Sequence, residues 1–552
     1  MSFAEAPNEL DRAVGRSAAQ RQDARLLRRV AFGALIGLFF GVQLGAIYGR
    51  MMNYGLTRDE MMFVPPAAFL PDWQLYSDVF FNHVPLSAWY FRAVHIVFGD
   101  LGLLEVARTG VFLAWLLLVL GIAWTAHRIS GSRMLAAFSA ISVITSTPLL
   151  TQAGMAATNN LLPLPLAVLG LGLFISETIE ERLRFAQLVA VGICLSLAAG
   201  IKVSAMMFIP MIAVGAFFLP VNATLGFRLA RVVLPLLIGG LLGALPLFWF
   251  LASDPQRFLA HILGFHTGPH VAYWQANAAS EPGLALGLAG KVELAFAAWL
   301  SGAALILVTV LSYLGWVALR DTAAGKVRED GFRGQFIVVF GTILLVSGLS
   351  FVPTPGFPQY YVPPLVCLPI LCALFYRRLR NERRLETVPV FAASIFMMLL
   401  VAAPRLGLGL VALTDREDFT TTRIARGGMA IKQALAANDV PNGPVATFLP
   451  IYPLEAGLPV YPEFATGQFA YRIAPYTEPQ LARMYRMVGE AGLPELFART
   501  PPAAFLLGYE NDLEAPMLRY AQENGYREID VPNLDNRYGD GRLFIRTPEN
   551  GS

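Results

Sequence analysis

The sequence predicts a polytopic α-helical membrane protein that ends in a small α/β domain. Hydrophobic residues make up 55% of the 552 residues and charged residues only 15%, whereas a soluble chain is about 25% charged. Between residues 30 and 410, apolar runs recur that are long enough to cross a hydrocarbon core of about 30 Å. Residues 411–552 have the mixed composition of a soluble domain. We therefore expect a membrane module over 1–410 and a globular C-terminal domain over 411–552.

About eleven segments are expected to cross the membrane as helices, because backbone polar groups in lipid must be satisfied within the segment. They lie near residues 30–49, 106–127, 134–152, 160–177, 185–200, 204–220, 232–252, 294–318, 335–352, 361–376 and 387–407. Residues 1–29 are polar and rich in Arg, without the pattern of a cleavable signal peptide. The first span is therefore expected to stay in the mature chain.

The distribution of Lys and Arg predicts the orientation of these spans. If the N-terminus is cytoplasmic, the cytoplasmic segments hold 21 Lys and Arg residues and the opposite loops hold six. Positive charge accumulates in short cytoplasmic loops, so we expect a cytoplasmic N-terminus and an external C-terminal domain. The external face then carries a long loop at 50–105, a second loop at 253–293 and a tight turn at 201–203.

The first external loop carries an ordered set of polar residues. It begins with TRDE at 57–60, continues with Tyr76-x-Asp78 and then reaches His83-x-Pro85. After these residues, the segment 84–98 has the pattern of an amphipathic helix lying along the interface. The loop is therefore expected to be packed and to hold its carboxylates at the boundary of water and lipid.

This arrangement resembles the GT-C glycosyltransferases, and within them the bacterial dolichyl-phosphate-mannose-protein-mannosyltransferase-like group that includes the aminoarabinose transferase of lipid A. The resemblance lies in the acidic pair after the first span, the Y-x-D and H-x-P elements that follow it and the overall topology. It implies a multi-pass enzyme of the bacterial inner membrane that uses a polyprenyl-phosphate-linked sugar. Its acceptor would be a lipid, a polysaccharide or a protein of the cell envelope, and no nucleic acid would take part.

The resemblance also implies site residues. Asp59 falls on the catalytic aspartate. Residues that match the group's pattern and are expected to bind the donor, its phosphate or the acceptor are Glu60, Tyr76, Asp78, Asn159 or its neighbour Asn160, Lys202 and Tyr360. Two cations are added by their positions, Arg58 beside Asp59 and Arg405 near the outer end of the last span. The chain departs from the group's pattern at Val84, where a Pro is usual, and at Gln359, where an Arg is usual.

The chemistry of such a transfer explains these residue types. An acceptor hydroxyl needs a base, and desolvation near the lipid boundary raises the pKa of a carboxylate and makes it a better one. The departing phosphate needs a cation, for which Lys202, Arg58 or a divalent metal is available. His83 and His266 are the candidate metal ligands, brought from different loops, and the other histidines are expected to be structural. A single displacement would invert the anomeric centre.

The C-terminal segment alternates predicted helices and strands. Helices are expected over 423–438, 478–492 and 513–525, and strands within 445–452, 501–510 and 541–547. This alternation indicates a small α/β layer. Two roles remain open for this domain. It either recognises the acceptor or forms a lid that stabilises the external loops.

Two other classes of protein share parts of this pattern. A transporter or flippase would carry charges inside its spans, which are nearly absent here. An O-antigen ligase or polymerase would place its large external loop in the later half of the chain. Proton or ion flux in liposomes would favour transport, and sugar transfer from a lipid phosphate would favour the enzyme.

Overall fold

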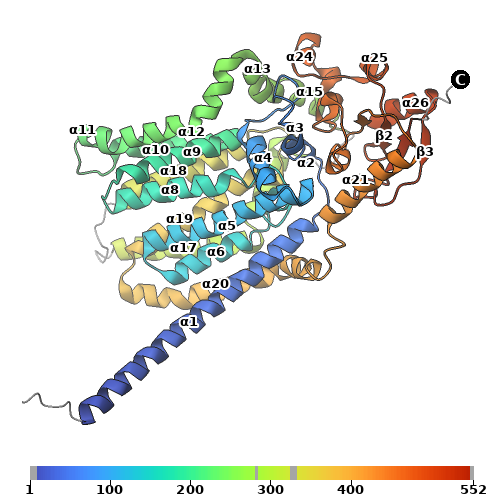
Figure 1. Ribbon diagram of the computed structural model, residues 1–552. Coiled ribbons are helices and arrows are strands. Elements are labelled where there is room, and N and C mark those ends of the chain that lie inside the picture. The colour runs from blue at the N-terminus through green and yellow to red at the C-terminus, as the bar shows by residue number, and fades with distance from the viewer. Residues whose placement is uncertain (1–8, 280–283, 324–331, 547–552) are drawn as a thin grey trace, which may run out of the picture.

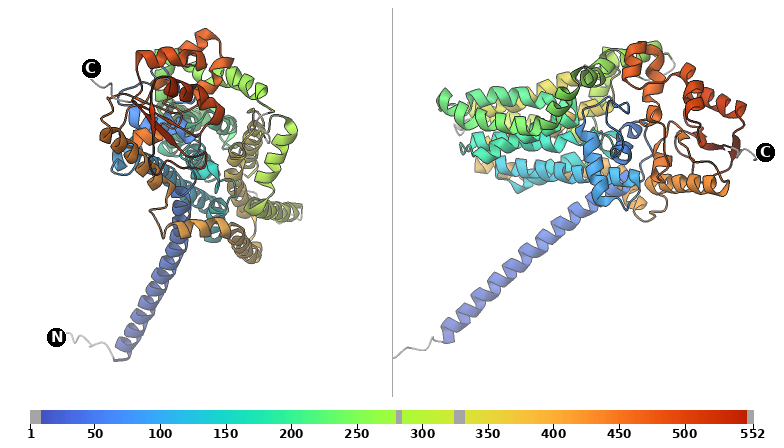
Figure 2. Two further views of the ribbon diagram at one scale, coloured as in Figure 1. Left: turned by 90° about the vertical axis from the view of Figure 1, so that its right-hand side faces the viewer. Right: turned by 45° about the horizontal axis from the view of Figure 1, so that its top comes forward.

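The computed structural model describes residues 9–279, 284–323 and 332–546. Long helices form a bundle, and the small C-terminal sheet lies beyond one end of it (Figure 1). The first helix projects from the bundle, and its N-terminal end points away from that sheet (Figure 2). The two termini of the described chain therefore lie toward opposite ends of the molecule.

Each of the eleven expected spans contains a helix. These helices are α1 (Glu9–Met52), α5 (Leu103–Ser130), α6 (Arg133–Ile144), α8 (Pro163–Ile179), α9 (Phe185–Ile201), α10 (Ile209–Phe218), α12 (Leu234–Ser253), α17 (Gly302–Ala323), α18 (Phe332–Ser350), α19 (Val362–Arg378) and α20 (Asn381–Ala412). Helix α6 ends at Ile144, well before the expected residue 152. Among the described residues, seven helical segments are long and apolar enough to span a membrane, and four more are apolar but shorter. The chain is a polytopic helical membrane protein, as predicted.

Short elements lead into several of these helices. They are the 3₁₀ turn η1 (Val203–Phe208) before α10, helix α11 (Leu225–Arg228) and the π turn η2 (Leu229–Val233) before α12, and the 3₁₀ turn η4 (Pro358–Tyr361) before α19. The turn expected at 201–203 is present, because α9 ends at Ile201 and the backbone of Lys202 is extended.

The prediction of one continuous span over 294–318 is wrong in its bounds. The segment is divided into α16 (Leu288–Trp299) and α17, which begins at Gly302 with a positive φ of 54°. A helix cannot continue through that left-handed conformation, which glycine adopts readily. Residues 1–8 and part of the expected cytoplasmic loop 319–334 lie outside the described residues.

Between the spans, short helices gather at the end of the bundle that faces the C-terminal region. These are α2 (Glu60–Phe63), α3 (Pro66–Phe69), α4 (Leu86–Phe98), α7 (Gln152–Met155), α13 (Pro255–Leu259), the π turn η3 (Ala260–Gly264), α14 (Phe265–Thr267), α15 (Pro269–Ala276) and α16. Helix α4 is the amphipathic helix predicted for 84–98. It packs on α5, where the Tyr90 hydroxyl donates to the carbonyl of Gly110 at 2.6 Å.

The C-terminal region is built on a four-stranded sheet in the order β1-β2-β4-β3. The strands are β1 (Val445–Ala446), β2 (Ala504–Leu507), β3 (Arg527–Ile529) and β4 (Arg542–Ile545). Strand β1 runs parallel to β2, and the other neighbours are antiparallel, with Phe505 opposite Phe544. The small α/β layer predicted for this region is therefore present.

Helices and 3₁₀ turns surround this sheet. They are α21 (Thr420–Ala437), α22 (Ile451–Glu455), η5 (Pro462–Phe464), α23 (Phe469–Ile473), η6 (Ala474–Tyr476), α24 (Pro479–Met484), η7 (Glu490–Gly492), α25 (Leu493–Arg499), η8 (Asn511–Glu514) and α26 (Ala515–Glu523). Two predictions were too long. Only the first residues of 445–452 form a strand, and only 479–484 of 478–492 form an α-helix.

Candidate active site

The TRDE turn separates its two acids. The Glu60 carboxylate accepts hydrogen bonds from the backbone N–H of Thr57 at 2.9 Å and of Ala157 at 2.9 Å, and it pairs with Arg108 of α5 at 2.9 Å. Both charged side chains are 0% exposed. Successive residues of a helical turn point about 100° apart, so Asp59 faces a different direction from Glu60 and lines a cavity that Glu60 does not reach. Glu60 thus fixes the turn that presents Asp59.

Asp59 lies on the wall of a cavity with a volume of about 700 Å³. This is the larger of two neighbouring spaces. The polar and charged side chains on this wall are Thr57, Arg58, Asp59, Asn82, His83, Thr147, Thr151, Gln152, Asn159, Asn160, Lys202, His266, His270, Gln359, Arg472 and Arg537, together with the hydroxyls of Tyr54, Tyr360 and Tyr538. They come from the first loop, from α7, from the turn after α9, from α14 and α15, from η4 and from the C-terminal region. A cavity of this size accommodates a sugar-sized ligand.

The surroundings of Asp59 suit a base. Burial raises the pKa of its carboxyl, and the charge of Arg472, a hydrogen bond from Gln152 and the charge of Lys202 offset part of that rise. The Gln152 side chain donates from Nε2 to Asp59 Oδ2 at 2.6 Å. Helix α7, which carries Gln152, is held in place by Trp115, whose indole N–H donates to the carbonyl of Gly154 at 2.8 Å.

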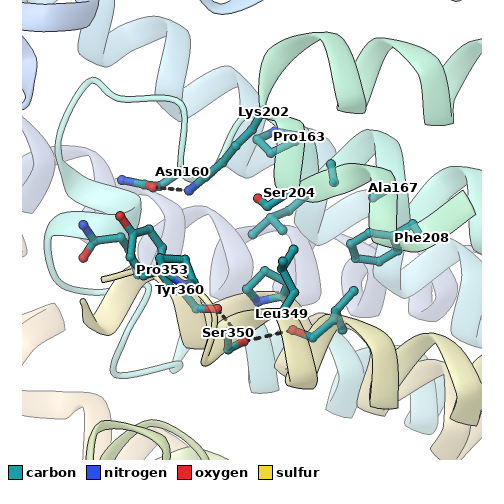
Figure 3. A pocket seen from close by; sticks show the side chains of 15 residues that line it. Asn160, Pro163, Ala167, Lys202, Ser204, Phe208, Leu349, Ser350, Pro353 and Tyr360 are labelled. Carbon is teal, nitrogen blue, oxygen red and sulfur yellow. Dashed lines mark hydrogen bonds between the residues drawn. The ribbon is translucent and has the colours of Figure 1, made fainter. Parts of the chain in front are cut away.

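Lys202 stands where the cavity meets a second, smaller pocket. Its ammonium donates to Asn160 Oδ1 at 2.6 Å and lies 5.4 Å from the centre of the Tyr360 ring. The pocket beyond it lies between α8, η1, α18 and the start of α19, and its lining is mainly aliphatic and aromatic (Figure 3). Asn160, Lys202, Gln359 and Tyr360 line both spaces. A cation therefore marks the boundary between a polar cavity and an apolar one.

Asn159 also lies on the cavity wall and is 3% exposed. Its side-chain amide donates weakly to the Ile201 carbonyl at 3.4 Å. The neighbouring Asn160 contacts Lys202 directly, although the sequence pattern did not favour one Asn over the other.

The C-terminal region supplies one wall of the same cavity, through Phe469, Arg472, Arg537 and Tyr538. Arg58 connects this wall to the first loop. Its backbone N–H donates to the Tyr538 hydroxyl at 2.9 Å, and its guanidinium lies 4.6 Å from the Tyr538 ring centre. Its Nε also pairs with Glu510 at 2.8 Å. Sequence reasoning missed Arg472, Arg537 and Gln152, because no local pattern in the chain marks them.

Four of the residues expected to bind ligands lie outside both cavity linings. Glu60 is saturated by protein partners, as described above. The Tyr76 hydroxyl donates to the His83 carbonyl at 2.7 Å, and the Tyr76 ring is buried among aromatic rings. Asp78 accepts from the backbone N–H of Gln74 at 2.8 Å. Arg405 lies on α20, away from both linings. For these four, the positions favour roles in structure over contact with a ligand in the cavity.

His83 and His266 come together from two loops, as predicted, with ring centres 5.6 Å apart. His266 Nε2 is hydrogen-bonded to the Asn82 carbonyl at 2.8 Å, and burial lowers the pKa of both histidines. Within the described ranges, no group of three or more His, Cys, Asp or Glu side chains is placed to hold a metal ion. The divalent metal that the sequence pattern allowed therefore stays a prediction, with His83 and His266 as the pair of candidate ligands that the fold brings together.

Comparison with known proteins identifies the fold. No family model matches the sequence, and no curated protein matches it. The structure of ArnT from Cupriavidus metallidurans in the apo state aligns over 93% of this chain and 98% of that chain, with a TM-score of 0.61 and 15% identity. The chain has the fold of ArnT. The same ArnT bound to undecaprenyl phosphate aligns over the same shares, with a TM-score of 0.57 and 15% identity.

The match to ArnT spans both the membrane helices and the C-terminal region, because nearly the whole of each chain is aligned. The alignment thus confirms the fold expected from the sequence, a bundle of membrane helices followed by a small C-terminal α/β region. A more distant match is the oligosaccharyltransferase of Archaeoglobus fulgidus in complex with Zn and sulfate, with a TM-score of 0.49 and 12% identity over 90% of this chain and 73% of that chain.

Proposed function

We propose that the protein is an inverting membrane glycosyltransferase that moves a sugar from a polyprenyl-phosphate donor to a hydroxyl of a cell-envelope acceptor. The observation that carries this proposal is the pairing of two groups in one cavity. A carboxylate with a raised pKa, Asp59, shares the cavity with the ammonium of Lys202, which stands at the head of an apolar pocket. The ArnT fold supports it, since ArnT has been solved with undecaprenyl phosphate.

The two groups divide the chemistry of a single displacement. The acceptor oxygen attacks the anomeric carbon while its proton passes to the Asp59 carboxylate. The bond from the anomeric carbon to the phosphate oxygen breaks, and the electron pair leaves with the polyprenyl phosphate. Lys202 stabilises the negative charge that develops on that phosphate. The apolar pocket next to Lys202 takes the first isoprene units of the lipid.

Neighbouring residues position these participants. Asn160 and the ring of Tyr360 hold the Lys202 ammonium in place. Asn159 and Arg58, also on the wall, are assigned to hydrogen bonds with the sugar or the acceptor. No step of this proposal uses a metal ion.

The charge distribution supports an external location of the reaction. With the N-terminus in the cytoplasm, as that distribution predicts, we assign the cavity and the C-terminal region to the external face of the bacterial inner membrane. Nucleotide sugars are absent there, so a lipid-borne donor is required. Residues 1–410 would form the catalytic membrane module and 411–552 the external domain.

The replacement of Asp59 by Asn tests the proposal. Purified full-length protein in detergent is screened with a panel of undecaprenyl-phosphate sugars and envelope lipid acceptors. We expect Asp59→Asn to lower the turnover by about 10²–10⁴-fold, the loss typical of a missing general base, while the protein still folds. The matched control is Asp78→Asn, the same change in the same loop but outside the cavity, which should keep nearly full turnover.

Equal turnover of wild type and Asp59→Asn would remove Asp59 from the mechanism. Absence of transfer from every lipid donor, together with ion flux in liposomes that depends on substrate, would replace the enzyme by a transporter.

A further inference from the structure

Arg472 reaches into the cavity from α23 of the C-terminal region. Its guanidinium carbon lies 4.9 Å from the centre of the Phe469 ring and 5.1 Å from the centres of both the Tyr273 and the Trp274 rings. Rings from α15 and α23 thus hold the cation from several sides, and such contacts fix an Arg without neutralising it. The planar guanidinium is kept ready to bind a carboxylate or a phosphate through two hydrogen bonds.

In the described part of the chain, the guanidinium of Arg472 forms no ion pair, and its buried Nε has no hydrogen-bond acceptor. The carboxylates of Glu510 and Asp59 act on it through their charges, from beyond ion-pair distance. By contrast, Arg58 on the same wall pairs with Glu510 at 2.8 Å. A half-buried cation without an ion-pair partner is costly, and here it faces a cavity that a ligand can enter.

The charges on the cavity wall are also out of balance. Arg58 is neutralised by Glu510, which leaves three cationic side chains on the wall, namely Lys202, Arg472 and Arg537, whereas Asp59 is the only carboxylate among the described lining residues. A donor with one phosphodiester brings one negative charge, which Lys202 meets at the apolar pocket. The remaining positive charge favours a second anion from another ligand.

The position of Arg472 indicates which ligand that is. Arg472 lines the polar cavity together with Asp59 but does not line the apolar pocket next to Lys202, so it lies on the side of the cavity where the base meets the acceptor. We propose that Arg472 binds an anionic group, a phosphate or a carboxylate, that the acceptor carries close to its reacting hydroxyl. This inference rests on the proposed function and narrows it to anionic acceptors selected by the C-terminal region.

Two binding assays on the full-length protein in detergent test this assignment. The first titrates glucose 6-phosphate against glucose, as soluble probes that differ in one anionic group. The second titrates undecaprenyl phosphate, the probe for the donor site. Each assay compares wild type with Arg472→Gln, Arg472→Lys and Lys202→Gln. Arg519→Gln is the matched control, because Arg519 belongs to the same region but is exposed at the surface.

We expect wild type to bind glucose 6-phosphate at least about tenfold more tightly than glucose, as a charge-assisted bidentate contact provides. Arg472→Gln should lose this preference, Arg472→Lys should keep part of it and Arg519→Gln should keep all of it. Undecaprenyl phosphate should bind to Arg472→Gln within about threefold of wild type. Lys202→Gln should show the reverse pattern: it should keep the preference for glucose 6-phosphate and bind undecaprenyl phosphate more weakly.

Three results would overturn the assignment. They are a wild type without preference for the phosphorylated sugar, an Arg472→Gln variant that keeps the preference, and an Arg472→Gln variant whose main loss is undecaprenyl phosphate. The last result would make Arg472 a contact of the donor phosphate. Failure of wild type to bind undecaprenyl phosphate would instead count against the proposed function, so the two failures are distinguishable.

Discussion

At the scale of single residues, two adjacent acids of one turn have different tasks. The carboxylate of Glu60 accepts hydrogen bonds from Thr57 and Ala157 and forms a buried ion pair with Arg108. Removing one partner of such an ion pair costs about 3–5 kcal/mol. Asp59 is held by a single side-chain hydrogen bond, from Gln152. The sequence motif predicted that both acids matter. It could not tell them apart, because the partner of Glu60 lies 48 residues away.

Replacing Gln152 by Leu should shift the acidic limb of the pH–rate profile to higher pH. The Gln152 amide favours the ionised form of Asp59, so it lowers the pKa that burial has raised above the usual value of 3.8. Without that amide the pKa of Asp59 rises further. Since only the carboxylate accepts a proton, the rate should begin to fall at a higher pH than in wild type.

The pH profile of kcat/KM for transfer measures this effect. The control is Gln256→Leu, the same change at an exposed position of α13, which should leave the limb in place. An unchanged limb in Gln152→Leu would mean that Asp59 does not set it.

At the scale of elements, the C-terminal region is joined to the bundle at the start of α5. Glu455, the last residue of α22, accepts the backbone N–H groups of Leu103 at 2.7 Å and Leu104 at 2.8 Å. These are unsatisfied donors of a helix N-terminus, where a carboxylate is a suitable partner. Hydropathy alone predicted α5 but gave no sign of this contact, since its acceptor lies 352 residues later.

The contact of Glu455 should make stability depend on pH. Burial raises the pKa of Glu455 to about 7, while the N–H groups of Leu104 and Leu103 lower it in part. Because the folded value exceeds the unfolded value of 4.5, folding favours the neutral acid. Its contribution, of about 3 kcal/mol, is full below the unfolded value and is lost as the pH rises through about 7.

Thermal unfolding in detergent at several pH values tests this dependence. The melting temperature of wild type should fall relative to that of Glu455→Gln as the pH rises from about 5 to about 8. Glu495→Gln, on the exposed face of α25, should follow wild type at every pH. A constant difference between wild type and Glu455→Gln would contradict the raised pKa.

At the scale of the whole molecule, the cavity is assembled from parts that are distant in sequence. The spans were predictable, because the length and composition of an apolar segment carry that information. The polar motif of the first loop was also predictable, because its residues lie close together in the sequence. The wall that contains Arg472, Arg537 and Tyr538 was not. Arg is common in soluble domains, so composition does not distinguish Arg472 from other arginines. Only the folded chain places it in the same cavity as Asp59. The two roles left open for the C-terminal region can therefore be weighed, and its cavity-lining cations favour acceptor recognition.

The orientation of the molecule gives a last prediction, which two single-cysteine variants test. Asn524→Cys lies just after α26 and Glu181→Cys lies in the turn after α8, and both positions are exposed. In right-side-out membrane vesicles, a membrane-impermeant maleimide should label Asn524→Cys at once and Glu181→Cys only after permeabilisation, because the charge distribution predicts that the Arg-rich loops face the cytoplasm. Background labelling is expected to be small, since Cys367 and Cys372 are buried and Cys194 is half-buried. Labelling of Glu181→Cys in sealed vesicles would place the cavity on the cytoplasmic face, where nucleotide sugars are available and the need for a lipid-borne donor would disappear.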